Sequence, residues 1–261
     1  MDCPACGPGS QKYHLGLNKA RGYLNCWVCG PKPLVSTLAE ISGWRPGDIV
    51  RLLREVLPVR EALTARKTGR YKPPVGVDGL GPAHRQYLAD RGFNPDEIAA
   101  LWGVGGIGVA PRMSWRLFIP IIYRHETVSW TTRAIGDVAA RYISASPKEE
   151  SLNHKHLLYG LDMACHAVAI VEGPTDAWAI GPGAVGQLGL VWTPQQVKLM
   201  IKFPVRVVCF DNTLDAQARA RKLTNTLSLY PGDTYRVCLS GKDPAASPKR
   251  EIKEFRKRFL D

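Results

Sequence analysis

The sequence predicts an α/β fold with a parallel β-sheet, a small α+β region before it and a β-rich module at the N-terminus. Short apolar runs separated by stretches of helical spacing predict parallel strands joined by crossover helices, and these runs are 167–171, 205–210 and 235–239. Each run ends near an acidic residue: Glu172, Asp211 or Asp243. Because ligands bind outside the carboxyl ends of parallel strands, we expect these carboxylates to gather along one edge of the sheet. Carboxylate oxygens in such a place suit Mg²⁺ or Mn²⁺.

Two pairs of cysteines near the N-terminus predict a structural zinc site. The pairs are Cys3-Pro4-Ala5-Cys6 and Cys26-Trp27-Val28-Cys29, and residues 7–25 between them give a spacing typical of zinc ribbons. Four thiolates complete a tetrahedral shell, so the zinc is expected to be structural. Disulfide pairing is the competing interpretation, and His14 is expected at the surface rather than among the ligands. Residues 12–26 are expected to form a hairpin between the pairs.

The chain is strongly basic. Its 261 residues contain 35 Lys and Arg against 23 Asp and Glu, a formal net charge of +12, which favours a polyanionic partner over charge that serves only solubility. The seven cysteines favour a reducing, cytoplasmic compartment. Three of them, Cys165, Cys209 and Cys238, are expected to be small core residues. No signal peptide is recognised, no apolar run approaches the roughly twenty residues that span a bilayer, and no membrane partner is expected.

Helical patterns and chain breakers divide the sequence into three parts. Residues 1–57 combine the ribbon with two short helices, at 34–41 and 46–56, where apolar residues keep helical spacing. Residues 58–82 mix basic residues with Pro and Gly and predict a basic, partly mobile linker. The remaining residues form the main domain, in which 83–164 is a basic subdomain and 165–261 carries the parallel sheet.

The basic subdomain is expected to begin with two helices and to continue with short strands. A helix over 83–91 ends at Gly92, and Asn94 followed by Pro95 is a start signal for the next helix. The segments 116–123 and 127–133 predict a hairpin, 141–144 a further strand, and 154–161 leads into a helix. Each cation of this region taken alone is compatible with ordinary surface charge, and as a set they are expected to neutralise phosphates: Arg116, Arg133, Arg141 and Lys155.

The sheet part alternates predicted strands and helices. A short helix around Asp176 ends by 181–183, a strand follows at 184–188, and Thr193 caps a helix that runs to about residue 203. Longer helices are expected over 214–229 and 249–260. Two divalent ions held by the acidic strand ends would suit phosphoryl or nucleotidyl transfer. Asp176 either supports such a metal site or only interacts favourably with the dipole of the helix in whose first turn it is expected. No glycine-rich phosphate loop is found, which argues against an ATP-driven motor.

These residues carry a resemblance to a known family. The segment Glu172-Gly173-Pro174-Thr175-Asp176, the strand end at Asp211 and the later Gly241-Lys242-Asp243-Pro244 resemble the three motifs of the Toprim fold. The upstream segments are similar to the RNA polymerase core of bacterial and bacteriophage DnaG-like primases. These segments are 115–120, Arg133, 141–144 and 155–161, together with 87–93, which matches the helical entry of that core. The zinc ribbon completes the order seen in phage primases.

The resemblance implies a DNA primase with a Toprim-type sheet. Glu172 would then be the central metal-binding and acid/base glutamate, Asp211 and Asp243 would bind the divalent ions, and Asp176 would support them. The four cations Arg116, Arg133, Arg141 and Lys155 would line a groove for nucleotides and template. The ribbon would read a short sequence on single-stranded DNA. Ribonucleoside triphosphates would be the substrates, in a bacterial or phage-infected cell, with a separate helicase and single-strand DNA-binding protein as partners.

The second and third motifs depart from the family pattern. Thr213 stands where a second carboxylate is expected after Asp211, and Ala245 stands two residues after Asp243. Asp215, one helical step on, is expected to reach the metals, or Thr213 to hold a metal-bound water. The missing acids motivate the alternative of a non-catalytic DNA-binding module that resembles recombination mediators, although those proteins place a helix-hairpin-helix before the zinc site. A topoisomerase or nuclease of this fold is a third alternative, for which no isolated attacking tyrosine is found.

Overall fold

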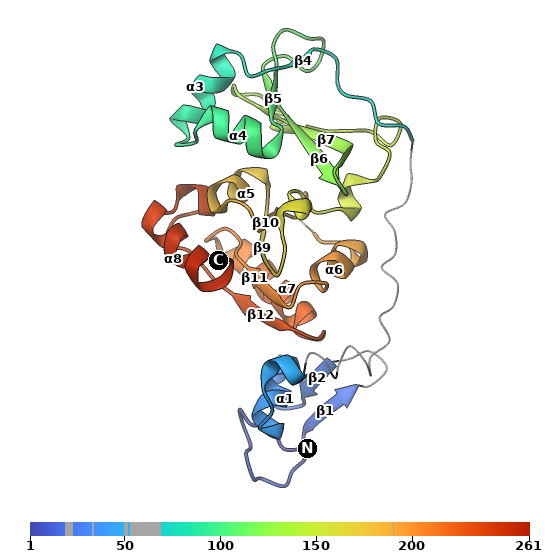
Figure 1. The fold of residues 1–261 in the computed structure, drawn as a ribbon, viewed down its shortest axis with the longest axis vertical. Helices are drawn as coiled ribbons and strands as arrows, with labels where there is room; N and C mark the ends of the chain where they lie inside the picture. The colour runs from blue at the N-terminus through green and yellow to red at the C-terminus, as the bar shows by residue number, and fades with distance from the viewer. Residues whose placement is uncertain (19–22, 33, 50–51, 53–68, 190) are drawn as a thin grey trace. The chain divides into compact units, whose positions relative to one another are not determined.

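The computed structural model describes the chain except residues 19–22, 33, 50–51, 53–68 and 190. It divides into two compact units. Figure 1 shows the helices and strands of the chain as a ribbon. The first consists of residues 1–63, 165–170 and 197–261, and the second of residues 64–164 and 171–196. The predicted domain boundaries at 57 and 58 lie outside the described residues, and the division into 1–57, 58–82 and 83–261 stays a prediction.

The N-terminal part of the first unit is a three-stranded antiparallel sheet followed by a helix. Its strands pair in the order β1 (Leu15–Asn18), β2 (Tyr23–Cys26) and β3 (Gly30–Lys32), and α1 spans Leu34–Ser42. The predicted hairpin and the first predicted helix are thus confirmed. Residues 46–49 are helical, and the rest of the second predicted helix falls largely outside the described residues. A small core joins sheet and helix through Leu15, Leu24, Leu34, Val35 and Ile49.

The predicted parallel sheet is present, with four strands in the order β10-β9-β11-β12. These strands are β9 (Ala167–Val171), β10 (Ala184–Gly186), β11 (Val205–Val208) and β12 (Asp233–Arg236). Both β9 and β12 run parallel to β11, so that Val208 pairs with Ile170 on one side and Arg236 on the other. The third strand begins earlier than its apolar run at 235–239, because pairing with β11 already starts at Asp233.

Four α-helices follow the strands, close to where they were predicted. They are α5 (Pro174–Ile180), α6 (Pro194–Met200), α7 (Leu214–Leu227) and α8 (Lys249–Phe259). Thr193 and Gln196 form a reciprocal cap at the start of α6, in which Gln196 N donates to Thr193 Oγ1 at 3.2 Å and Thr193 N donates to Gln196 Oε1 at 2.9 Å. In α8 the buried residues are Ile252 and Phe255, and the lysines and arginines lie among the remaining positions. Across the described ranges, none of the helices has the length and apolar character that a membrane crossing requires.

A second, five-stranded antiparallel sheet forms the body of the second unit. Its order is β4-β5-β6-β7-β8, with β4 (Val77–Asp78), β5 (Gly105–Ile107), β6 (Arg116–Tyr123), β7 (Glu126–Ala134) and β8 (Tyr142–Ser144). The β6–β7 hairpin turns at Arg124 and His125, whose φ angles of 55° and 64° are the left-handed values that a tight hairpin turn requires. The hairpin and the strand at 141–144 confirm the sequence prediction.

Two helices accompany this sheet. The first, α3, spans Pro82–Asp90 and is followed by Gly92 at φ 78°, and the second, α4, spans Pro95–Trp102. The Asn94 side chain accepts hydrogen bonds from Asp96 N and Glu97 N, so the predicted N-cap is confirmed.

Two segments of the second unit differ from expectation. Within the predicted linker, the described part from Gly69 onward is attached to the rest of the unit: Gly69 N donates to Glu150 O, in the loop after β8, at 2.9 Å, and Trp130 Nε1 of β7 donates to Lys72 O at 2.8 Å. Residues 154–161 hold 3₁₀ turns, at His154–His156 and Leu161–Met163, instead of leading into an α-helix. Gly160, at φ 75°, interrupts the segment.

Candidate functional site

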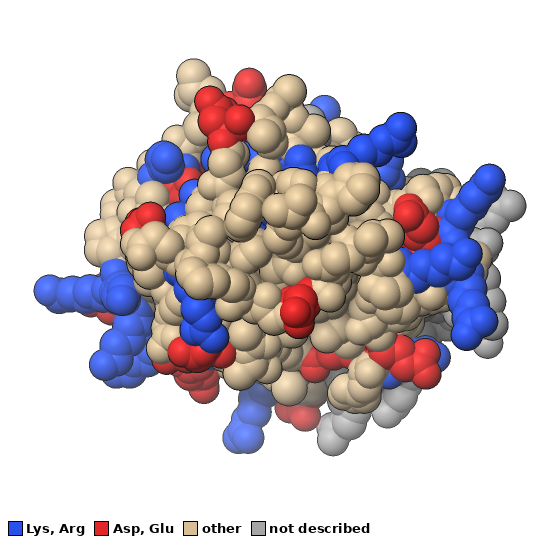
Figure 2. Space-filling view, turned by 90° about the horizontal axis from the view of Figure 1, so that it is seen from above, with Lys and Arg blue, Asp and Glu red and all other residues tan. Residues whose placement is uncertain are grey.

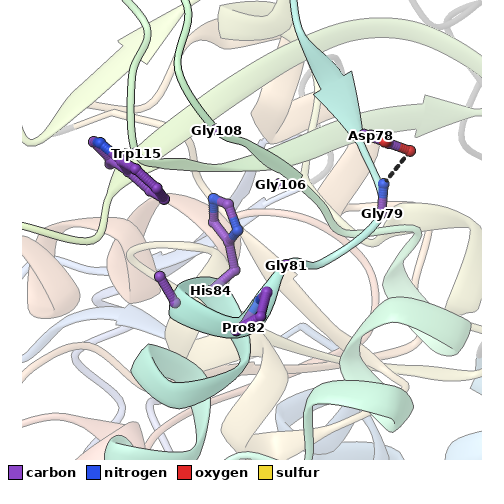
Figure 3. Close-up of a pocket in the computed structure, with 9 residues that line it drawn as sticks. Asp78, Gly79, Gly81, Pro82, His84, Gly106, Gly108 and Trp115 are labelled. Carbon is purple, nitrogen blue, oxygen red and sulfur yellow. Dashed lines mark hydrogen bonds between the residues drawn. The ribbon is translucent and has the colours of Figure 1, made fainter.

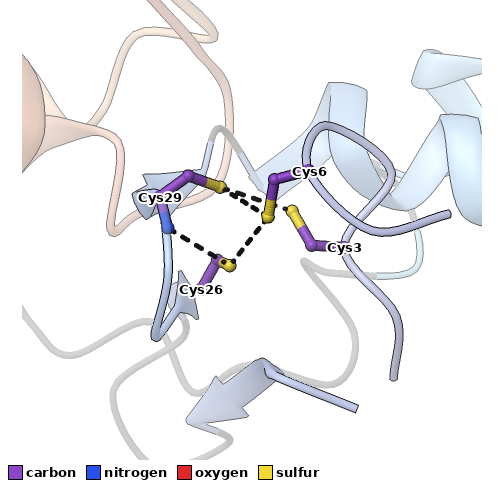
Figure 4. A group of neighbouring side chains, drawn as sticks. All are labelled: Cys3, Cys6, Cys26 and Cys29. Carbon is purple, nitrogen blue, oxygen red and sulfur yellow. Dashed lines mark hydrogen bonds between the residues drawn. The ribbon is translucent and has the colours of Figure 1, made fainter. Parts of the chain in front are cut away.

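The four cysteines lie together and fit one zinc ion (Figure 4). Their Sγ atoms all lie within 4.8 Å of one another, and the separations are 3.6 Å for Cys3–Cys29, 3.6 Å for Cys6–Cys26 and 3.2 Å for Cys6–Cys29. Zinc–sulfur bonds of about 2.3 Å in a tetrahedron place sulfurs about 3.8 Å apart, close to these values. Two segments supply the ligands: the N-terminal turn at Cys3–Cys6, and the end of β2 with the turn that follows it, which hold Cys26 and Cys29.

The surroundings of Cys26 favour the thiolate that zinc binds. Burial raises the pKa of its thiol, but the N–H groups of Cys29 and Val28, at 3.5 Å and 3.4 Å from Sγ, and the ring of His14 outweigh burial and lower the pKa to about 5. The His14 Nδ1 atom lies 3.4 Å from Cys26 Sγ. His14 is therefore half-buried against the cluster rather than at the surface, where the sequence analysis placed it.

Two of the acidic candidates come shortly after a strand, whereas Asp243 lies seven residues after the end of β12. Asp211 lies three residues after β11, and Glu172 comes directly after β9. Residues 167–170 of β9 pair in parallel with residues 205–208 of β11, so these two strands end at the same edge of the sheet. In the first unit, Asn212 N donates to Lys242 O at 2.8 Å, which joins the loop at Asp211 to the loop that holds Asp243. Within the described ranges, the cysteines are the only set of three or more His, Cys, Asp or Glu whose ligand atoms approach within 4.8 Å of one another.

The remaining candidates from the acidic motifs, including Thr213, lie at the starts of helical elements. Asp176 is 7% exposed in the first turn of α5. Thr213 is the N-cap of α7, and its Oγ1 accepts a hydrogen bond from Ala216 N at 3.3 Å. Asp215 is exposed in the first turn of the same helix. Asp243 Oδ1 accepts from Ala246 N at 2.7 Å and so caps the 3₁₀ turn Pro244–Ala246. The side chains of Thr213 and Asp243 therefore each cap the helical turn that follows them.

The two predicted arginines of the hairpin are buried and have protein partners. Arg116 is 5% exposed, and its Nη2 and Nη1 atoms donate to the carbonyl oxygens of Ala140 and Arg141 at 2.7 Å and 3.3 Å. Burial lowers the pKa of this guanidinium. Arg133 is 4% exposed and donates to the hydroxyls of Tyr87 and Tyr142. Neither guanidinium is open to solvent. Each one holds in place the carbonyl or hydroxyl groups to which it donates.

The other two predicted cations, Arg141 and Lys155, are exposed. The face shown in Figure 2 carries Lys and Arg side chains singly and in small groups among other residues.

Sequence reasoning did not single out the roles of Tyr87 and Tyr142, although both lie in segments used for the resemblance. Cys209 is buried as predicted, but Cys165 and Cys238 are exposed because they lie outside the strand that each adjoins.

Comparison with solved structures places this fold beside those of primases. The zinc-binding and RNA polymerase domains of the Aquifex aeolicus primase are 17% identical, with a TM-score of 0.60 over 94% of this chain and 74% of that one. The primase fragment of the bacteriophage T7 primase-helicase is 16% identical, with a TM-score of 0.52 over 97% of each chain. A DnaG catalytic domain solved with single-stranded DNA is 19% identical, with a TM-score of 0.55 over 68% of this chain and 72% of that one.

No family model and no curated protein matches the sequence. The structural likeness therefore shows the fold: a mixed α/β fold of the kind found in primase catalytic cores, with a zinc-binding ribbon before it.

Proposed function

We propose that the protein is a DNA primase, a nucleotidyltransferase that makes short RNA primers on single-stranded DNA from ribonucleoside triphosphates. The observation that carries the proposal is the presence, in one chain, of a four-thiolate ribbon and the fold of primase catalytic cores. The net charge of +12 supports a nucleic acid as partner. A separate helicase and a single-strand DNA-binding protein are proposed as partners during DNA replication.

The acidic strand ends are the proposed metal site. Glu172, Asp211 and Asp243 would hold Mg²⁺ or Mn²⁺, with Asp176 and Asp215 in support. Bound divalent ions stabilise the charge that develops on the attacking and leaving oxygens of a phosphoryl group. The support from this chain is the parallel register of β9 with β11 and the hydrogen bond from Asn212 N to Lys242 O, which ties two of the acidic loops together.

The basic subdomain is the proposed template and nucleotide surface. Arg141 and Lys155 are exposed, so they are assigned to direct contact with phosphates. Arg116 holds the carbonyls of Ala140 and Arg141, and thereby fixes the backbone from which the Arg141 side chain extends. Arg133 holds Tyr142, a residue that is 39% exposed and whose ring is proposed to stack on a base.

The test is primer synthesis in vitro. The full chain is incubated with single-stranded DNA templates of varied sequence, four ribonucleotides and Mg²⁺ or Mn²⁺, and the products are separated by size. Short oligoribonucleotides are expected from the wild type. The Glu172→Gln variant is expected to lose synthesis while still binding DNA.

The alternative of a non-catalytic DNA-binding module gives a different pattern. It predicts salt-sensitive DNA binding that is unchanged by metal or nucleotide, and no primers on any template. The absence of a carboxylate at Thr213 and Ala245 is the feature that favours this alternative.

A further inference from the structure

A cavity in the second unit is lined by none of the residues to which a role is assigned above. Its volume is about 220 Å³, and it lies at the start of α3 between the end of β4 and the strand β5 (Figure 3). Four glycines line it: Gly79, Gly81, Gly106 and Gly108. Its walls are therefore largely backbone, and the two large side chains that line it are those of His84 and Trp115.

His84, which lines this cavity, carries a buried and unsatisfied acceptor. Its side chain is buried, with 3% of the residue exposed, and Nε2 lies 3.1 Å from the carbonyl oxygen of Ile107. A carbonyl only accepts, so Nε2 carries the proton and the neutral ring leaves Nδ1 as an acceptor. Within the described part of the chain, the buried Nδ1 has no hydrogen-bond partner. A buried acceptor without a donor is costly, which points to a ligand that donates.

The glycines locate this acceptor within the cavity. A Cβ atom added at Gly81 would lie 3.5 Å from His84 Nδ1, and one added at Gly106 would lie 2.7 Å from the same atom. Nδ1 therefore faces the glycine-lined side of the cavity. At Gly108 and Gly79 an added Cβ would meet nothing within 4 Å, so space continues beyond them.

Trp115 supplies a flat apolar wall. It is 48% exposed, and its ring centroid lies 6.3 Å from that of His84, with the ring planes tilted by 32°. Its backbone is held at φ 57° by two hydrogen bonds, Trp115 N to Gly108 O at 2.8 Å and Ile135 N to Trp115 O at 3.0 Å. A large aromatic side chain kept partly in water by a fixed backbone is suited to stacking on a planar ligand.

The start of α3 adds donors. Gly81 is the N-cap without a side-chain hydrogen bond, and Pro82 has no N–H, so the first N–H groups of the helix belong to Ala83 and His84. Both residues line the cavity. The cavity thus combines a stacking wall, one acceptor and backbone donors, which matches the neighbouring donor and acceptor groups on the edge of a nucleobase.

We propose that this cavity binds a single nucleobase, with the ring against Trp115 and a base N–H donating to His84 Nδ1. A cavity of roughly 150 Å³ accommodates benzene, so 220 Å³ admits a one- or two-ring base but not a whole nucleotide. The sugar and phosphate would remain outside. The choice of a nucleobase over other planar heterocycles rests on the proposed function. The base comes either from a free nucleotide or from a single strand.

The experiment observes the ring of His84 directly. Proteins labelled with ¹⁵N at histidine are titrated with adenosine, cytidine, N6,N6-dimethyladenosine and a short single-stranded oligonucleotide, and the His84→Gln variant identifies the resonance. An upfield shift of Nδ1 is expected with adenosine or cytidine if free nucleosides enter, and with the oligonucleotide alone if a strand supplies the base. Removing the donor in dimethyladenosine is expected to weaken binding about tenfold.

Two glycine variants distinguish a loss of space for the ligand in the cavity from a general effect of a Gly→Ala substitution on the protein. Gly81→Ala places a methyl group against Nδ1 at 3.5 Å without a strained φ and is expected to weaken binding about tenfold or more. Gly136→Ala, in the same unit and with nothing within 4 Å, is the matched control and should bind as the wild type does. No Nδ1 shift with any probe, or equal weakening by both variants, overturns the proposal. Because binding is read without synthesis, a wild type that binds bases but makes no primers contradicts the proposed function alone.

Discussion

The Arg133 guanidinium donates from Nε to the Tyr87 hydroxyl at 2.7 Å, and so joins β7 to α3 across 46 positions of sequence. The same group donates from Nη1 to the Tyr142 hydroxyl and lies over the Tyr142 ring, 5.2 Å from its centroid. One buried cation therefore connects a helix and two strands of the second unit. Its two tyrosine partners raise the pKa of Arg133 despite desolvation, which by itself lowers it.

Arg133→Met is expected to destabilise the second unit. The substitution keeps much of the apolar stem but removes the donors to two hydroxyls, and hydrogen bonds to charged groups contribute about 1.5–3 kcal/mol each. Thermal unfolding should show a lower Tm. Arg141→Met is the matched control, because Arg141 is exposed and the change should alter stability by no more than about 0.5 kcal/mol. Equal stability of the two variants would contradict the structural role of Arg133.

Removal of the zinc ligands should unfold the ribbon and leave the rest of the chain folded. A module of this size buries too little apolar surface to be stable without a metal. Cys26→Ser is expected to lose its zinc during dialysis against a chelator that leaves the wild type loaded, with metal content measured by atomic absorption. Cys165→Ser, outside the cluster and exposed, should keep one zinc per chain. Equal zinc retention by both variants would disprove the four-thiolate site.

Loss of an exposed phosphate contact should reduce the salt dependence of DNA binding. For single strands the slope of log K against log salt is about −0.7 for each phosphate neutralised. Lys155→Met is therefore expected to reduce the slope by about 0.7, measured by fluorescence anisotropy with a labelled oligonucleotide. Lys257→Met, an exposed cation of α8 without an assigned contact, should leave the slope unchanged. If both variants shift the slope alike, Lys155 makes no specific contact.

Signals that act over a few residues predicted much of this fold. The Asn94-Pro95 start of α4 and the strands at 116–123 and 127–133 depend on local backbone preferences, and the structure confirms them. The cysteine spacing also predicted the four-cysteine cluster, because each of the two tight turns presents a pair of thiolates. The start of β12 was missed because Asp233 and Thr234 are polar, and their place in the strand comes from pairing with β11.

Long-range packing decided what the sequence did not predict. Whether an arginine faces solvent or a tyrosine depends on how α3, β7 and β8 come together, and no local pattern distinguishes Arg133 from Arg141. The glycine-lined cavity could not be predicted from the sequence either. Its glycines give no periodic pattern in the sequence, and only the packed structure places Gly81 and Gly106 against His84. The proposed metal site lies between these cases, because the parallel strands could be predicted but the side-chain arrangement beyond their ends could not.

Thr213→Asp should strengthen metal binding without disturbing α7. Thr213 caps this helix by accepting from Ala216 N at 3.3 Å, and Asp is at least as good an N-cap, so stability should change by no more than about 0.5 kcal/mol. The variant adds a carboxylate two residues after Asp211, where the resemblance expects one. The Mg²⁺ concentration for half-maximal primer synthesis is expected to fall roughly threefold to tenfold, because carboxylate number sets affinity for hard cations. Thr213→Asn is the matched control, since it keeps the cap but adds no charge. If the Asp and Asn variants share one Mg²⁺ dependence, position 213 does not reach the metals, and Asp215 becomes the acid to test next.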